Sequence, residues 1–322
     1  MIFGQDRAVE QFAAAWRRGS LHHAWLLAGP KGVGKATFAR EAATRVLAEA
    51  AGPPVDAPGL ETPEDHRIAK LVEAGSHPDL RWLERLVNEK TSNLARNITV
   101  DQVRSLGDLF DLTPALSPWR VVVIDSIDDL EKSAANALLK MLEEPPANTI
   151  FFLVSHAPGR LLPTIRSRCR KLDFQALDDD AMTSVLSYHV ELKGAEADQV
   201  LAAAGGSAGL ALALMQLDLV DLEKAAVAIL RKGDRTNKRR SDLASELGKR
   251  GAGDRYAAFL EILPSLIARE TRTLSGAPRQ RAVEAYSKAR ELVAIAPRLS
   301  LDPASTVFQL GAILASVADP VP

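Results

Sequence analysis

The stretch Gly29-Pro30-Lys31-Gly32-Val33-Gly34-Lys35 has the spacing of a phosphate-binding loop, and Ala36 follows it where such loops place Ser or Thr. The glycines allow backbone N–H groups to close around phosphates, and Lys35 brings a positive charge to the β and γ oxygens. Ala36 cannot hold Mg²⁺. Thr37 should point elsewhere, because one helical residue rotates a side chain by about 100°. The loop predicts a nucleotide fold with impaired metal chemistry.

The residues around this loop fit a strand, a loop and a helix in succession. Residues 24–28 (AWLLA) read as a short buried strand, and residues 36–50 read as a helix. A glycine-rich turn with a fortuitous lysine would not require this context. The context therefore favours a nucleotide loop.

Two further apolar runs, at 119–125 and 149–155, predict strands that are buried on both faces, as in a parallel sheet. Between them, a helix over 134–143 should stop before Pro145. After Phe174 only helical patterns remain. The expected fold is α/β over roughly the first 170 residues, a doubly wound parallel sheet with helices on both faces, followed by helical domains.

Three shorter segments complete this outline. Residues 6–18 have helical apolar spacing, and four prolines between 53 and 63 predict an exposed excursion without regular structure. Residues 98–104 predict an extended entry into a helix that runs through Phe110, with Asp101 as its cap.

Composition excludes several functional classes. The 322 residues suffice for two or three domains, and 40 basic against 41 acidic residues give no overall attraction to nucleic acid. The single cysteine, Cys169, excludes an internal disulfide and a thiolate-rich metal site. The beginning of the chain does not read as a signal peptide, and no run is apolar enough for a membrane helix. We expect a cytoplasmic protein.

A second motif lies at Asp125-Ser126, where the strand over 119–125 ends. Ring-forming P-loop hydrolases place Asp-Glu at this point, with the Asp organising Mg²⁺ and the Glu polarising the attacking water. Ser126 is no general base without a partner, and no histidine is adjacent to it in the sequence. Asp128 and Asp129 follow too far along the turn to be assigned, and Asp125 could instead be a helix cap. Together with Ala36, Ser126 predicts a site released from hydrolysis.

Five short motifs stand out in the first 175 residues: Gly4-Gln5, LHHA at 21–24, ITVDQVR at 98–104, NALLKMLEEPP at 136–146 and SRC at 167–169. Together they resemble the AAA+ clamp-loader subunits of bacterial DNA polymerase III, and the delta-prime type most. The run at 136–146 is the most specific of them, and the remaining helices match only in character.

The resemblance implies a wedge-shaped subunit with an AAA+ domain over 1–173, a helical lid over 174–213 and a helical collar over 214–322. It implies a five-membered ring with delta and gamma/tau subunits that uses ATP to open the sliding clamp and place it on primed DNA. Such a ring belongs to the DNA polymerase III holoenzyme, a DNA-directed DNA polymerase. The chain itself is expected to have no independent ATPase activity.

By position, the resemblance gives Ser155 the place of the first nucleotide-sensing residue and Arg168 that of the arginine finger, which acts in trans on a neighbour's ATP. A guanidinium stays charged and forks onto phosphate oxygens, which suits that role. Cys169 is expected to be a packing residue. The residues expected to contact nucleotide are Gly29, Gly32, Gly34, Lys35, Ala36, Thr37, Asp125 and Ser155.

The chain departs from the family pattern in two further places. Many delta-prime subunits carry a four-cysteine zinc module after the first helix, but this chain has the proline-rich excursion there, and His66 with His77 would make a poor zinc site. The second sensing region, at 205–210, lacks its arginine and has Gly209 and Leu210 instead. No metal site is expected, and ATP binding should be weak and without hydrolysis.

The segment 231–250 holds eight basic and three acidic side chains without interleaved aromatics. Such runs are usually solvated helix faces, although contact with DNA phosphates stays open.

Two other functions also stay open. One is an ATP-hydrolysing gamma/tau-like motor, with Thr37 and another carboxylate standing in. The other is a small-molecule P-loop kinase, which lacks an evident set of lid arginines and leaves the run at 136–146 unexplained.

Overall fold

The computed structural model describes residues 1–87, 94–189, 195–297 and 299–318. The chain divides into two units, Met1–Ala181 and Met182–Pro322, and each is described by itself. Helix α8 (Asp179–His189) spans this boundary. The finer boundaries expected at 173 and 213 stay predictions.

The first unit is built on a five-stranded parallel sheet in the order β2-β3-β4-β1-β5. The predicted α/β fold is confirmed, and so are the three predicted strands, of which β3 begins one residue later than expected. The two edge strands, β2 and β5, are short and partly exposed, so they lack the apolar run that marks a buried strand. The strands are β1 (Ala24–Ala28), β2 (Leu80–Glu84), β3 (Arg120–Asp125), β4 (Thr149–Ser155) and β5 (Arg170–Asp173).

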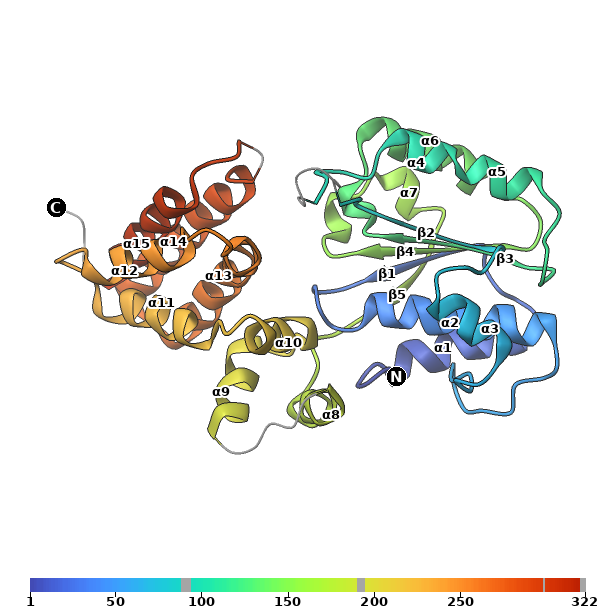
Figure 1. Cartoon of the computed structure of the whole chain (residues 1–322), viewed down its shortest axis with the longest axis horizontal. Helices are drawn as coiled ribbons and strands as arrows, with labels where there is room; N and C mark the ends of the chain where they lie inside the picture. Colours follow the sequence, from blue (N-terminus) through green and yellow to red (C-terminus); the bar gives the residue numbers. More distant parts are fainter. Residues whose placement is uncertain (88–93, 190–194, 298, 319–322) are drawn as a thin grey trace. The chain divides into compact units, whose positions relative to one another are not determined.

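Helices cover both faces of this sheet (Figure 1). Successive strand residues point to opposite faces, so Trp25 and Leu27 of β1 contact one helical layer and Leu26 contacts the other. One layer holds α1 (Asp6–Arg17), α2 (Lys35–Ala51) and α3 (Arg67–Glu73), and the other holds α4 (Val100–Arg104), α5 (Leu106–Asp111), α6 (Lys132–Glu143) and α7 (Pro163–Arg166).

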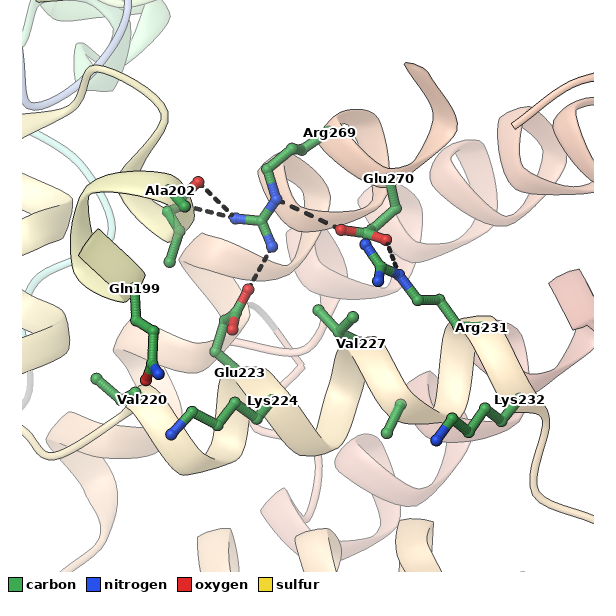
Figure 2. Close-up of a pocket in the computed structure, with 12 residues that line it drawn as sticks. Gln199, Ala202, Val220, Glu223, Lys224, Val227, Arg231, Lys232, Arg269 and Glu270 are labelled. Atoms are coloured by element: carbon green, nitrogen blue, oxygen red, sulfur yellow. Dashed lines mark hydrogen bonds and ion pairs between the residues drawn. The ribbon is translucent and has the colours of Figure 1, made fainter. Parts of the chain in front are cut away.

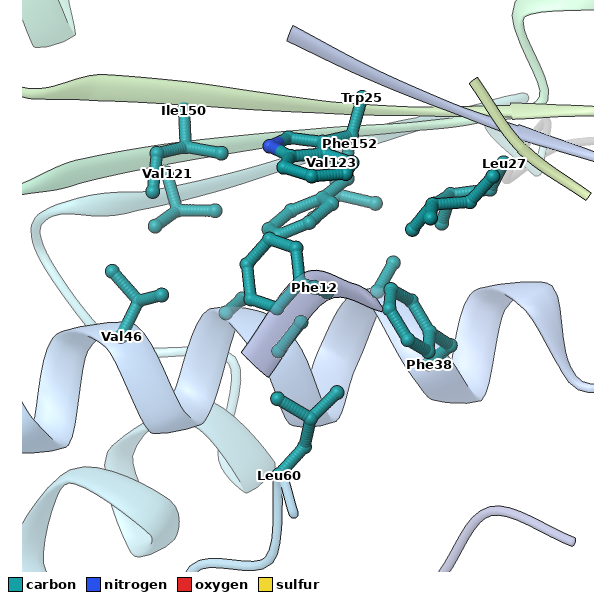
Figure 3. Close-up of a cluster of buried hydrophobic side chains, with 14 of the residues drawn as sticks. Phe12, Trp25, Leu27, Phe38, Val46, Leu60, Val121, Val123, Ile150 and Phe152 are labelled. Carbon is teal, nitrogen blue, oxygen red and sulfur yellow. The ribbon is translucent and has the colours of Figure 1, made fainter. Parts of the chain in front are cut away.

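Aromatic rings fill the space between the first layer and the sheet (Figure 3). Phe12 of α1 lies at the centre, with ring centroids 5.1 Å from Trp25 and 5.3 Å from Phe152. Phe38 of α2 packs edge-on against Phe12 at 5.9 Å. All four side chains are fully buried, so this core fixes α1 and α2 against β4 and against β1, the strand that leads into the phosphate loop.

The start of α4 corrects one prediction. Thr99, and not Asp101, caps this helix, because its hydroxyl accepts from the backbone N–H of Gln102 and the Gln102 side chain accepts from the N–H of Thr99. This reciprocal pair is a capping box, whereas Asp101 already lies inside the first turn. The helix also divides at Ser105, so the segment through Phe110 is two short helices.

The proline-rich excursion between α2 and α3 contains no helix or strand, as predicted, but it is not a free loop. Arg45 of α2 is 8% exposed and donates to the carbonyls of Val55, Ala57 and Glu61 at 2.9, 3.0 and 2.5 Å. Its Nε also donates to Glu49 at 2.5 Å. One arginine therefore binds three carbonyls of the excursion to the adjacent helix.

The second unit is helical in its described part, as predicted, and its core lies mainly among its last five helices. Gly311 of α15 allows close packing on α12, because a Cβ there would lie 2.6 Å from the Cβ of Arg240. The helices are α9 (Ala195–Ala204), α10 (Ala208–Gln216), α11 (Val220–Lys232), α12 (Lys238–Leu247), α13 (Gly253–Thr273), α14 (Gly276–Ile295) and α15 (Pro303–Ala318).

A polar network joins three helices of this unit beside a cavity of about 430 Å³ (Figure 2). Arg269 of α13 donates to the carbonyls of Ala202 and Ala203 at the end of α9, and pairs with Glu223 of α11. The neighbouring Glu270 is buried and pairs with Arg231 at 2.5 Å. These contacts satisfy the last carbonyls of α9 and neutralise a buried carboxylate.

Among the described helices of both units, none is long and apolar enough to span a bilayer.

Candidate nucleotide site

The predicted phosphate loop connects β1 to α2, and its lysine is turned inward. Lys35 is 3% exposed, and its Nζ donates to the carbonyl of Gly29 at 2.7 Å and to that of Pro30. Burial lowers the pKa of Lys35 to about 8, against the opposing effects of Asp125 and Asp128. The ammonium is therefore satisfied by its own loop, in a site where charge is costly.

Gly29 and Gln5 determine how this loop packs against the segment that follows β5. A Cβ at Gly29 would lie 2.2 Å from the carbonyl oxygen of Phe174, so only glycine fits where the loop leaves β1. The buried side chain of Gln5 donates to the carbonyls of Val33 and Gln175 at 3.1 and 2.9 Å. Gln5 therefore ties the loop to the segment after β5, a role that its sequence motif alone did not reveal.

The metal side of the site lacks its usual ligand. Ala36, which follows the buried Lys35, is half-buried, and Thr37, one position further, is exposed. A methyl group at position 36 offers Mg²⁺ no oxygen. The loop amides and Lys35 suit phosphate, but the donor set around them does not suit the metal that such loops hold.

Asp125 ends β3, beside Glu84 at the end of β2. Burial and then Glu84 raise the pKa of Asp125, while Lys35 opposes them. The following residue, Ser126, is 3% exposed, and its hydroxyl donates to Asp129 at 3.3 Å. Asp129 also pairs with Arg85 at 3.3 Å. The hydroxyl at the position of the water-polarising glutamate is thus engaged with a neighbouring carboxylate.

Asp128 belongs to the site, although no local sequence pattern assigns it there. Its two oxygens accept from the hydroxyl of Ser155 at 3.0 Å and from the backbone N–H of His156 at 2.6 Å. The turn after β3 and the end of β4 are therefore joined, and Ser155, at the predicted sensing position, is fully buried. Both oxygens of Asp128 are occupied within the chain, which leaves it a poor general base.

His156 is a second residue that the sequence did not place in the site. Burial, and next the charge of Lys35, lower its pKa to about 4. Its Nδ1 is buried without a hydrogen-bond partner in the described part of the chain. Although no histidine adjoins Ser126 in the sequence, the pairing of β3 with β4 brings His156 next to Asp128. An imidazole with so low a pKa is a weak proton acceptor at neutral pH.

Arg168 lies just after α7 and makes no hydrogen bond or ion pair with the residues around Lys35 described above; its partners are Glu143 and Thr164. Its Nη2 lies 2.6 Å from Oε1 of Glu143, and its Nη1 donates to the carbonyl of Thr164 at 2.9 Å. The side chain is 33% exposed. The adjacent Cys169 is partly buried, and burial raises the pKa of its thiol to about 12, so it is not a nucleophile at neutral pH.

The described residues also contain no cluster of side chains suited to a structural metal ion. No three His, Cys, Asp or Glu side chains among them are arranged to hold a metal ion. His66 accepts from the N–H of Ile68 as the cap of α3, and His77 accepts from the N–H of Asp79.

In the second unit, Ser207 caps α10 through the N–H of Leu210, in the region where an arginine would sense phosphate. The basic segment 231–250 is partly used for internal contacts: the buried Asp234 accepts from the N–H groups of Arg239 and Arg240 and pairs with the Arg240 guanidinium at 3.4 Å. Lys249 also pairs with Glu246.

Comparison with known proteins extends these observations. The family model described as DNA polymerase III, delta subunit, matches residues 4–178, more than half of the chain. The delta-prime subunit of Pseudomonas aeruginosa is 38% identical over 186 residues, covering 58% of this chain and 53% of that protein. The delta-prime subunit of Escherichia coli is 34% identical over 215 residues, covering 65% and 59%.

The tau subunit of Bacillus subtilis is 29% identical over 270 residues, covering 81% of this chain and 45% of that protein. Among solved structures, a gamma subunit-related protein of Thermotoga maritima covers 96% of this chain and 100% of that one, with 20% identity and a TM-score of 0.48. The chain spans about half the length of the curated relatives it matches. Its family match and its delta-prime relatives show that it belongs to the delta-prime-type clamp-loader subunits of DNA polymerase III.

Proposed function

We propose that this chain is a non-hydrolysing member of a hetero-oligomeric clamp loader. In this proposal it assembles with delta and gamma/tau subunits, and the assembly opens a sliding clamp and places it on primed DNA. Its own nucleotide site is degenerate, and Arg168 acts on ATP that a neighbouring subunit holds. The chain contributes structure and one arginine to the reaction, and the neighbour contributes the metal and the attacking water.

The observation that carries this proposal is the state of the carboxylates beside Lys35. Hydrolysis of a phosphoanhydride requires a metal ligand set and a group that orients water. Ala36 supplies no oxygen, Ser126 supplies no carboxylate, and Asp128 gives both oxygens to Ser155 and His156. None of these three residues therefore offers a free ligand to Mg²⁺ or a free carboxylate to water.

The first experiment measures ATP turnover by the isolated chain. We expect none above background, with weak nucleotide binding that depends little on Mg²⁺, because the loop amides and Lys35 are intact while the metal ligand is absent. Lys35→Ala is the control. Steady turnover that this substitution abolishes would contradict the degenerate site.

A second experiment tests the assembly. The tagged chain, purified from its own cells, should bring delta and gamma/tau subunits with it at fixed ratios. If it is recovered only with proteins unrelated to replication, the assembly proposal fails whatever its ATP turnover.

One observation favours an active gamma/tau-like motor instead, since the alignment with a tau subunit covers 81% of this chain. That alternative needs a replacement for the missing hydroxyl, and Thr37 is exposed on α2. The turnover experiment with Lys35→Ala separates the two functions directly.

A further inference from the structure

The support of Arg168 comes from the end of α6, within the run at 136–146. Glu143 is the last residue of that helix, and its Oε1 lies 2.6 Å from Nη2 of Arg168. We propose that Glu143 is a positioning residue that fixes the Arg168 guanidinium in the orientation in which it meets a neighbour's phosphate. This inference rests on the proposed function of Arg168.

The pattern of donors supports positioning. A guanidinium has five N–H donors in a fixed plane. In the described part of the chain, one of them donates to the carbonyl of Thr164 at 2.9 Å, Nη2 lies in an ion pair with Glu143, and no other contact engages the group. Two anchors from different helices define the plane of the group, while its remaining N–H groups stay available to phosphate oxygens.

The helix that carries Glu143 provides a rigid support. The preceding residue, Leu142, is 1% exposed in the core on that side of the sheet. Its carbonyl is 3.1 Å from Nε2 of His23, just before β1. The end of α6 is therefore held by a buried side chain and by a hydrogen bond to the strand region, so Glu143 has little freedom to drift.

Sequestration of Arg168 by Glu143 is the opposite possibility, and the exposure of the pair argues against it. The Arg168 side chain is 33% exposed and that of Glu143 is 48% exposed. Solvent weakens the attraction in such a pair, and a phosphate with several negative oxygens competes well against one carboxylate. The pair therefore orients the guanidinium without withholding it.

The neighbouring Glu144 is a matched control. It is also acidic and exposed, and it follows α6 directly, but no side-chain partner is found for it within the described residues. A charge lost at 144 changes the local field almost as much as one lost at 143. Only the loss at 143 removes an anchor of Arg168.

The experiment uses the reconstituted complex with sliding clamp, primed DNA and ATP. The rate that disappears in Arg168→Ala defines the Arg168-dependent hydrolysis. We expect Glu143→Ala to lower that part roughly three- to tenfold with the KM for ATP unchanged, since a misplaced catalytic group costs rate and the neighbour's loop still binds ATP. Glu143→Gln keeps an acceptor oxygen and should recover most of the rate, and Glu144→Ala should leave it intact.

The double variant Glu143→Ala/Arg168→Ala decides between positioning and a general structural role. If Glu143 acts through Arg168, the double variant hydrolyses ATP at the rate of Arg168→Ala alone. A further fall, or an unchanged or faster rate in Glu143→Ala, would overturn the inference while leaving Arg168 in place. An unchanged rate in Arg168→Ala would remove the proposed finger itself, and the inference with it.

Discussion

Lys35 and Arg168 are both candidates for binding phosphate, but they differ in their burial and in how many of their donors the protein already uses. Lys35 is buried, gives its donors to carbonyls of its own loop, and has a pKa lowered to about 8. Arg168 is a third exposed, stays charged, and has two anchors with donors to spare. The cation inside the nucleotide loop is committed to the fold, whereas the one after α7 is available to another molecule.

The largest expected effect tests whether Arg168 contributes to ATP hydrolysis while Lys35 does not. In the reconstituted complex, Arg168→Ala should lose roughly 10³ to 10⁵ in rate at the single ATP site that it completes, because a finger supplied in trans stabilises the transferring phosphoryl group. Lys35→Ala in the same chain should change DNA- and clamp-stimulated hydrolysis far less. Steady-state ATPase and clamp-loading assays measure both.

Thermal melts of both variants are the control for this contrast, because simple destabilisation would also lower activity. Arg168→Ala should melt like the unmodified chain and still assemble. Unchanged hydrolysis and clamp loading in Arg168→Ala would reduce the arginine to a surface charge.

A third cation, Arg45, is the opposite case to Arg168, because its donors bind groups of the chain itself. It lies deep beside the proline-rich excursion, and its donors go to three carbonyls and one carboxylate. We expect Arg45→Met to lower the free energy of unfolding by about 1 to 3 kcal/mol, because several partly buried acceptors lose their donor together. Urea unfolding measures this loss, and limited proteolysis should cut the excursion faster.

Arg18→Met is the matched control, since Arg18 is exposed after α1 and its side chain makes no hydrogen bond or ion pair among the described residues. It should be neutral. Equal stability of Arg45→Met and Arg18→Met would mean that the excursion does not depend on its arginine.

Sequence patterns were sufficient for the three inner strands of the sheet, but not for its two edge strands or for the inner details of the site. Apolar runs identified β1, β3 and β4, because strands buried on both faces have few polar residues. Asp128 and His156 were missed because they are 28 positions apart, and only the pairing of β3 with β4 brings their ends together. No local pattern records such a contact.

Two other misses have local causes. Asp101 and Thr99 both fit a helix start, and only the hydrogen bond to Gln102 decides between them. The prolines of the excursion correctly excluded regular structure, but proline content says nothing about which side chain binds the freed carbonyls. Arg45 fills that role from an adjacent helix.

A pH experiment tests whether the cluster around Lys35 is as inward-facing as its contacts indicate. His156 has a pKa of about 4 in the folded protein, against 6.5 as its ordinary value. Between these values the unfolded chain binds more protons, so acidification should destabilise the fold, with His156 contributing at most about 1.4 kcal/mol per pH unit. Urea unfolding of His156→Asn between pH 6.5 and 4 should show a shallower loss.

The pKa values of His23 and His77 are also lowered by burial, so part of the pH dependence should survive in His156→Asn. If His156→Asn and the unmodified chain lose stability in parallel, the imidazole is well solvated and the cluster is open.

The smallest expected effect is that of removing metal. Four thiolates in some delta-prime subunits would occupy the stretch that Arg45 holds in this protein, and this chain has a single cysteine, at 169. Arg45 already donates to carbonyls of the excursion, and the nearby His66 and His77 each accept a hydrogen bond from a backbone N–H group. We therefore expect chelation to leave the melting temperature and far-UV circular dichroism unchanged, and elemental analysis to find no stoichiometric zinc. One tightly held zinc per chain, with loss of structure on chelation, would mean that a metal and Arg45 hold the excursion together. Arg45→Met with chelator present and absent would then measure how the two divide that stabilisation.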